Sequence, residues 1–265
     1  RGSSRSDTIE NVISNIQKII HQGIQEIVLT GVNIGDFGRK NGENFFDLLK
    51  QINSLSDLKR VRISSIEPNL LTDEIIEFVA KSNNIMPHFH IPLQSAHPRI
   101  LGEMKRKYNL ELFSHKVKKI KELMPHACIA VDVICGFPGE TETEFQQSVD
   151  YLSSIDITYM HVFTYSIRKN TQAEILKNHV PEKDKKNRSI ILHNLSEKKK
   201  LNFYHSFQNE ICEVLFESEI ENNNISGFTP NYIRVKVPYR IDYINSIIPV
   251  QLKQIDSDGV YIGIM

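Results

Sequence analysis

The sequence of 265 residues contains no tryptophan and only three cysteines, Cys128, Cys135 and Cys212. An odd number of widely separated cysteines argues against a disulfide framework and for a reducing compartment. No two of them have the close spacing of a zinc or redox motif. The sequence of this chain alone therefore predicts no metal site.

An excess of charge and long apolar runs are also absent. The 32 basic side chains balance the 32 acidic ones, so the chain as a whole has no field that attracts polyanions. Any nucleic-acid surface must therefore be local.

No apolar run approaches the roughly 20 residues that a membrane-spanning helix needs. We expect a cytoplasmic monomer without a membrane segment.

Short apolar runs alternate with stretches of helical periodicity. Such alternation predicts parallel strands joined by right-handed helical crossovers, in either a parallel α/β barrel or an open doubly wound sheet. The first run is apolar throughout, which predicts a strand buried on both faces. The runs are "EIVLTG", "RVRISSI", "PHFHIPL", "CIAVDVICGF" and "TYMHVFTYS".

The residue pattern of the sequence changes after Pro181. A long, basic, amphipathic helical stretch comes first. From about Ile211, short apolar and aromatic runs are broken by turn signals such as "ENNN" and "DSDG". Close turns between short strands predict a small all-β barrel. We therefore predict two domains, residues 1–205 and 206–265.

Polar and glycine-rich segments follow the predicted parallel strands, where ligands of such folds bind. Turn formation alone also selects these residue types. Asp132 is more informative, because a carboxylate inside an apolar strand is costly unless it is paired or faces a ligand. His88 and His90 share one face of their strand but need a third ligand to bind a metal.

Several motifs together resemble the radical S-adenosylmethionine methylthiotransferases over almost the whole length. The resemblance implies an incomplete (β/α)6 barrel that lacks its first strand, followed by a C-terminal barrel similar to the RNA-binding TRAM domain. "LTGVNIGDFG" is similar to the branch that methylthiolates N6-threonylcarbamoyladenosine beside the tRNA anticodon. The other motifs are "RGSSRS", "HIPLQSAHPRILGEMKRKY", "GFPGET" and "FTYSIRKNTQA".

The resemblance also implies which residues hold S-adenosylmethionine. The first strand end would lie near the amino-acid moiety, the third near the ribose and the Gly136 turn under the adenine. Arg106 would pair with a carboxylate. The implied contact residues are Thr30, Gly31, Asn33, Ser64, Glu67, Gln94, Ser95, Arg106, Asp132 and Gly136.

In the resembled family, "RG-x-SRS" follows the CxxxCxxC loop of a radical-generating cluster. The full-length protein would carry two 4Fe-4S clusters, and their cysteine ligands are absent from this chain, whose own cysteines lack cluster spacing. The chain is therefore expected to be an inactive fragment. The implied reaction is reductive cleavage of S-adenosylmethionine, hydrogen abstraction from C2 of the modified adenine, sulfur insertion and methylation.

Contact with the tRNA anticodon stem-loop is expected from the C-terminal domain and from two basic helical patches, the first in residues 99–121 and the second in residues 183–200. Aromatic side chains interleaved with cations are typical of single-stranded RNA binding. The residues are Phe228, Tyr232, Arg234 and Lys236. The alternatives are a non-catalytic RNA-binding scaffold with a vestigial barrel, and the isopentenyladenosine or ribosomal-protein branch of the same family.

Overall fold

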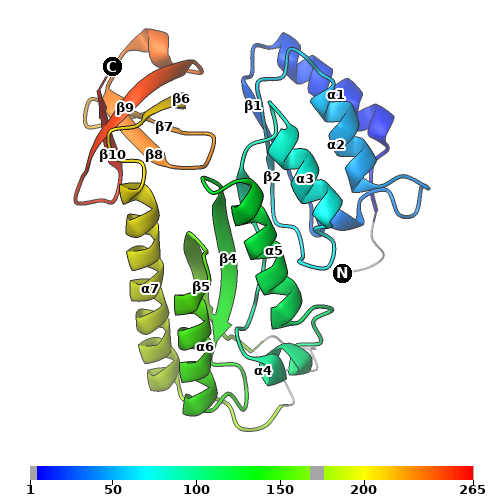
Figure 1. Cartoon of the computed structure of the whole chain (residues 1–265), viewed down its shortest axis with the longest axis vertical. Coiled ribbons are helices and arrows are strands. Elements are labelled where there is room, and N and C mark those ends of the chain that lie inside the picture. The colour runs from blue at the N-terminus through cyan, green and yellow to red at the C-terminus, as the bar shows by residue number, and fades with distance from the viewer. Residues whose placement is uncertain (1–4, 168–175, 265) are drawn as a thin grey trace.

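The computed structural model describes residues 5–167 and 176–264, so parts of "RGSSRS" and "FTYSIRKNTQA" lie outside the described residues. Strands and helices alternate up to a long helix, α7, which leads into a second set of strands (Figure 1). The helices are α1 (Ile9–His21), η1 (Ile34–Asp36), α2 (Phe45–Asn53), α3 (Asp73–Lys81), α4 (Pro98–Glu103), α5 (Leu110–Leu123), α6 (Glu142–Ser154), α7 (Glu182–His205) and η3 (Ile241–Tyr243). The strands are β1 (Glu26–Leu29), β2 (Arg60–Ile63), β3 (His88–His90), β4 (Cys128–Cys135), β5 (Tyr159–Thr164), β6 (Ile211–Glu221), β7 (Asn224–Phe228), β8 (Arg234–Pro238), β9 (Ile247–Ile255) and β10 (Tyr261–Ile264).

The first five strands are parallel, as the alternation predicts. β1 pairs with β2, and β3, β4 and β5 form a second group. Parallel bridges from Val61 to Ile85 and from Ser65 to His90 join the two groups. Among the described residues no pairing closes β1 onto β5. The parallel part is therefore an open arc, in agreement with an incomplete barrel.

The prediction that the first strand is buried on both faces is wrong. Val28 in the middle of β1 is 53% exposed. The physical reason is that β1 has β2 as its only strand partner in the described part of the chain, so its apolar sequence borders an open edge. Continuous burial is found instead in β2, whose four residues are all buried.

Helix starts are fixed locally by side-chain caps. At α6 the Thr141 hydroxyl accepts from the backbone N–H of Glu144, and the Glu144 carboxylate accepts from the N–H of Thr141. This reciprocal capping box satisfies two otherwise free helix donors. It determines where the turn after β4 ends and where α6 begins.

The C-terminal strands form a closed barrel in the order β10-β8-β7-β6-β9, which confirms the predicted small β-domain. Its interior is a separate apolar cluster that includes Val214, Val235 and Leu252. Gly263 is needed inside it, since a Cβ there would lie 2.2 Å from Cγ1 of Val250. α7 ends at His205 next to this barrel.

Two arginines of β2 join the barrel to the parallel strands. Arg60 donates to the carbonyl oxygens of Phe228 and Glu213 at 2.9 and 3.0 Å. Arg62 donates to those of Pro230 and Thr229, both at 2.8 Å. Both arginines are at most 3% exposed. The barrel consequently lies at the end of the sheet where the parallel strands begin (Figure 1).

None of the described helices is both long and apolar enough to span a bilayer.

We expect Arg62→Ala to lower the free energy of unfolding by about 3–5 kcal/mol, the typical cost of breaking a buried ion pair. The substitution removes the Nε bond to Glu26 and leaves two buried carbonyls without their donor. Urea unfolding measures the loss. Arg39→Ala, at a side chain that is 70% exposed, is the control and should change stability by about 0.5 kcal/mol or less. A loss below 1 kcal/mol for Arg62→Ala would contradict the joining role.

Candidate functional site

The carboxyl ends of β3 and β4 are joined through Gln94. Its N–H donates to the carbonyl of Asp132 at 2.7 Å, and its own carbonyl accepts from the N–H of Ile134 at 2.8 Å. Gln94 has a positive φ of 68°, which is uncommon for a residue other than glycine. The backbone therefore holds Gln94 in an unusual conformation exactly where the sequence predicts a ligand contact.

Arg106 crosses from the segment after α4 to the same strand ends. Its Nη2 donates to Oε1 of Gln94 at 3.0 Å, and its Nη1 lies 3.5 Å from Oε1 of Glu67. The structure thus brings together three predicted residues: Glu67 and Gln94, which follow β2 and β3, and Arg106, which follows α4. Of these three, Arg106 lines a cavity of about 330 Å³ together with Phe137 and Tyr165.

Three predicted residues carry buried polar atoms with no hydrogen-bond partner among the described residues: Asn33 Oδ1, Ser64 Oγ and Arg106 Nε. Buried polar atoms are paired in nearly all native structures, so each of these needs an explanation. A polar ligand at the strand ends would supply partners. The residues present therefore fit a cofactor with amine, carboxylate and hydroxyl groups, such as S-adenosylmethionine.

Other predicted contacts are arranged differently. Thr30 and Gly31 are exposed beyond β1. Ser95 is buried, and its hydroxyl accepts from the N–H of His97 at 3.3 Å, so it stabilises its own turn. Gly136 has a φ of +77°, and a Cβ there would lie 2.5 Å from Cγ of Lys185. Glycine is required at this position for the packing of α7, independently of any ligand.

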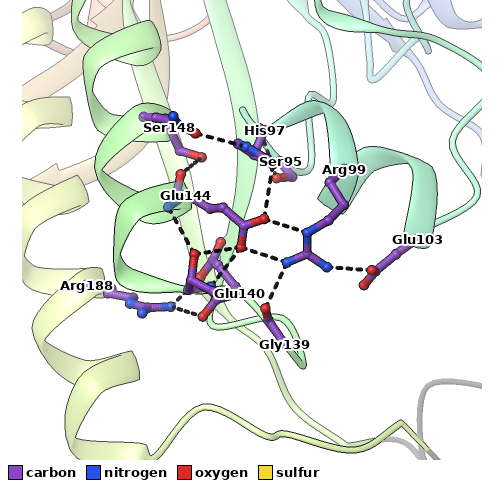
Figure 2. A network of polar contacts seen from close by, with 11 residues as sticks. Ser95, His97, Arg99, Glu103, Gly139, Glu140, Glu144, Ser148 and Arg188 are labelled. Atoms are coloured by element: carbon purple, nitrogen blue, oxygen red, sulfur yellow. Dashed lines mark hydrogen bonds and ion pairs between the residues drawn. The ribbon is translucent and has the colours of Figure 1, made fainter.

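The turn after β4 is held by a network of ion pairs (Figure 2). Arg99 donates to both carboxylate oxygens of Glu144 and to the carbonyl of Gly139. Arg99 lowers the pKa of Glu144 to about 2. On the other side of the turn, Arg188 of α7 pairs with Glu140 at 2.7 Å. The "GFPGET" turn is therefore rigidly positioned.

Some cations of the two predicted basic patches are paired within the fold, whereas others, such as Lys183 and Lys186, are exposed. In the second patch, Lys185 and Arg188 are buried and paired with acidic residues. In the first, Lys116 pairs with Asp73 and Lys119 with Glu77, both at 2.6 Å. These partners lie on α3, far away in sequence, so the pairing could not be predicted from helix periodicity.

Between the two ends of the parallel strands lies a polar cluster. Nε2 of His90 is 2.8 Å from Oδ1 of Asp132, which identifies the partner that a carboxylate in an apolar strand requires. His161 of β5 is the strand neighbour of Asp132 and belongs to the same cluster. Sequence reasoning missed His161. The available signal was the alternation of residues in "TYMHVFTYS", which places His161 on the same face of the strand as Tyr159 and Phe163.

The loop 228–232 of the C-terminal barrel reaches the beginning of the parallel strands. The Tyr232 ring stacks on His88 with centroids 4.3 Å apart and on Phe228 with centroids 4.5 Å apart. Arg62 lies 4.9 Å from the centroid of the Tyr232 ring. Both faces of Tyr232 are therefore covered, so it offers no free stacking platform in this arrangement.

The other predicted RNA contacts differ in whether their side chains are already paired within the fold. Lys236 forms an ion pair with Asp256. Arg234 is exposed. Arg234, Phe228 and Tyr232 line a cavity of about 440 Å³ together with His161 and other residues of β5 and α7. This cavity connects three of the four predicted RNA-binding residues with the polar cluster.

The family of the chain follows from comparison with known proteins. Residues 1–152 match the model of the radical SAM superfamily. The chain belongs to the radical SAM superfamily.

Curated relatives of this radical SAM chain include tRNA-modifying enzymes. It is 36% identical over 258 residues to threonylcarbamoyladenosine tRNA methylthiotransferase MtaB of Bacillus subtilis, covering 95% of this chain and 57% of the relative. The protein of the same name from Aquifex aeolicus is 36% identical, with 89% and 56% covered. A tRNA-2-methylthio-N(6)-dimethylallyladenosine synthase of Clostridium botulinum is 36% identical, with 97% and 58% covered. The chain thus spans somewhat more than half the length of these relatives.

The cysteines of this radical SAM chain do not fit an iron–sulfur cluster. Burial raises the pKa of Cys128 to about 12 and that of Cys135 to about 11, so neither favours the thiolate that ligates iron. Cys212 lies in the C-terminal barrel, on β6.

Reconstitution of this chain with iron and sulfide should therefore give no cluster absorbance near roughly 400 nm, where thiolate-ligated clusters absorb. Absorbance spectroscopy with iron and sulfide analysis measures this. A stoichiometric cluster would overturn the expectation.

His88 predicts a specific dependence of stability on pH. Burial lowers the pKa of His88 to about 3, and both ring nitrogens are buried without a partner among the described residues. The unfolded chain binds a proton at His88 below about pH 6.5, whereas the folded chain does not until about pH 3. His88 therefore reduces stability progressively as the pH falls through this window.

We expect His88→Phe, which keeps a ring against Tyr232, to remove this loss. Relative to wild type, the free energy of unfolding of the variant should rise by about 2 kcal/mol more at pH 5 than at pH 8. This figure follows because pH 5 lies about 1.5 units below the pKa of histidine in the unfolded chain. Urea unfolding at both pH values measures the difference. Equal effects at pH 5 and pH 8 would show that His88 does not titrate in this way.

Proposed function

We propose that this chain is the barrel and C-terminal part of a cytoplasmic, monomeric tRNA methylthiotransferase. Its substrate would be N6-threonylcarbamoyladenosine in the anticodon stem-loop, modified at C2 of the adenine. The names of the relatives from Bacillus subtilis and Aquifex aeolicus support this assignment. The structural observation that supports it is the cavity lined by Phe228, Arg234 and His161, which connects the predicted RNA contacts with the polar cluster of the parallel strands.

The strand ends would bind S-adenosylmethionine, which supplies the radical and the methyl group when it is bound with the cluster. Arg106 would hold the carboxylate, because its guanidinium has an unpartnered Nε and already contacts Gln94. Ser64 and Asn33 would pair with polar groups through their unpartnered oxygens. Gln94 would orient the ribose, since its backbone is fixed between β3 and β4. Two 4Fe-4S clusters would be held by cysteines of the whole protein that this chain does not contain.

The substrate base would enter through the cavity between β5, α7 and the C-terminal barrel. The Phe228 ring contacts Tyr232 by stacking and lines that cavity, so it can stack a nucleobase there. Arg234 is exposed at the same cavity and can pair with a phosphate. Phe163 of β5, 52% exposed, extends the apolar wall toward the strand ends.

A second substrate is supported by a specific observation. The Clostridium botulinum relative, named for dimethylallyladenosine, is as similar in identity as the two named for threonylcarbamoyladenosine. The two substrates differ in their N6 group, so the modified nucleoside distinguishes them directly.

The test is expression of the full-length protein in a bacterial strain that lacks its own methylthiotransferases. Digested tRNA should contain 2-methylthio-N6-threonylcarbamoyladenosine, detected by mass spectrometry. Arg106→Ala should lower its amount by roughly 10- to 100-fold, because one charge-assisted contact contributes about 1.5–3 kcal/mol. Phe228→Ala should weaken binding of an anticodon stem-loop in a direct binding assay, since base stacking contributes about 1–3 kcal/mol.

Arg39→Ala is the matched control, since it removes an exposed guanidinium outside the site. It should leave both the modified nucleoside and RNA binding unchanged. Appearance of the dimethylallyl product alone would move the protein to that branch. RNA binding without any methylthiolated nucleoside would favour the non-catalytic scaffold.

A further inference from the structure

We propose that His90, Asp132 and His161 form a binding site for one divalent transition-metal ion of the Zn²⁺ or Fe²⁺ class. The site is distinct from cysteine-ligated iron–sulfur clusters and does not depend on the function proposed above. Its basis is the position of three potential ligand atoms, one from each residue, which all lie within 4.8 Å of one another.

The three ligands are held by three adjacent strands. His90 is the last residue of β3, Asp132 lies in β4 and His161 in β5. Asp132 and His161 are direct partners in the parallel register, and β3 pairs with the preceding residues of β4. Strand pairing fixes the spacing of the backbone, so the cluster is present before any ion arrives.

The side chains are partly oriented already. Nε2 of His90 lies 2.8 Å from Oδ1 of Asp132, and the His90 and His161 rings are 5.2 Å apart. Tyr159 packs edge-on against His161 at an interplanar angle of 89°. The His161 ring nitrogens make no hydrogen bond to any residue of the described ranges 5–167 and 176–264, which leaves them available as ligands.

The donor set selects the class of metal. Two imidazole nitrogens and one carboxylate oxygen suit Zn²⁺ or Fe²⁺, whereas Ca²⁺ and Mg²⁺ prefer oxygen ligands. With metal–ligand distances of about 2.0–2.2 Å, ligand atoms lie about 3.3–3.6 Å apart around a tetrahedral ion. The His90–Asp132 pair, at 2.8 Å, is closer than this and would open slightly around the ion. Rotation of the exposed His161 ring closes the remaining distance.

An ion can reach the cluster and would keep an open position. His161 lines the cavity of about 440 Å³ between β5, α7 and the C-terminal barrel. Three protein ligands leave at least one coordination position for water or a substrate atom, as in catalytic zinc sites. His88 does not become a fourth ligand, because its ring is stacked on Tyr232.

Titration of the chelator-stripped chain with Zn²⁺ in a calorimeter, and with Co²⁺ by visible absorption, tests the site without RNA or S-adenosylmethionine. We expect one equivalent of metal to bind and to raise the melting temperature. His161→Ala and Asp132→Asn should each weaken binding by roughly 100-fold or more, since even residues that only support ligands change affinity 10- to 100-fold. His161 is exposed, so its substitution should leave the fold intact, which circular dichroism verifies.

Two variants are matched controls. His115 forms another histidine–carboxylate pair, with Asp73 at 2.9 Å, but there Lys116 replaces the second histidine. His115→Ala should therefore leave metal binding unchanged. Cys212→Ser, at the half-buried cysteine of the C-terminal barrel, should also leave it unchanged.

Absence of one-equivalent binding overturns the proposal, as does binding that survives His161→Ala or is lost in Cys212→Ser. None of these results bears on methylthiolation, which is measured on cellular tRNA. Conversely, failure of methylthiolation leaves the metal titration unaffected. The two proposals can therefore fail separately.

Discussion

Two arginines at the start of β2 constrain the relation between the two parts of the molecule. Each guanidinium binds two backbone carbonyls of the C-terminal barrel, and both side chains are buried. A buried arginine without these acceptors would be strongly unfavourable, so the contact is maintained whenever the fold is intact. The loop 228–232 is thereby held at the beginning of the parallel strands, where Tyr232 stacks on His88.

Because of this contact, the two ends of the parallel strands are lined by different kinds of side chain. At the carboxyl end, Gln94, Glu67 and Arg106 meet beside unpartnered buried polar atoms. At the opposite end, Tyr232 and His88 close the space with stacked rings. The polar cluster of His90, Asp132 and His161 lies between them and is accessible from the side. A base entering from the side would meet this cluster before it reached the strand ends.

Features set by nearby residues could be predicted from the sequence, whereas those set by distant contacts could not. The alternation of strands and helices, the Thr141–Glu144 cap and the polar strand ends all follow from local chemistry. The burial of Lys185 and Arg188 depends on their packing against the turn after β4, nearly fifty residues away. The joining of His161 to the cluster likewise depends on strand register, which no single motif encodes.

The pairing of charges changes how RNA recognition by this chain would work. Several cations that look free in the sequence are paired with acidic partners within the fold, and the net charge is zero. Fewer phosphates could then be neutralised than the sequence suggests, so counterion release would contribute less to affinity. Recognition would have to rely on stacking against Phe228 and on fitting a base into the cavity. Stacking tolerates any base, so discrimination between bases would have to come from the fit of a base in the cavity.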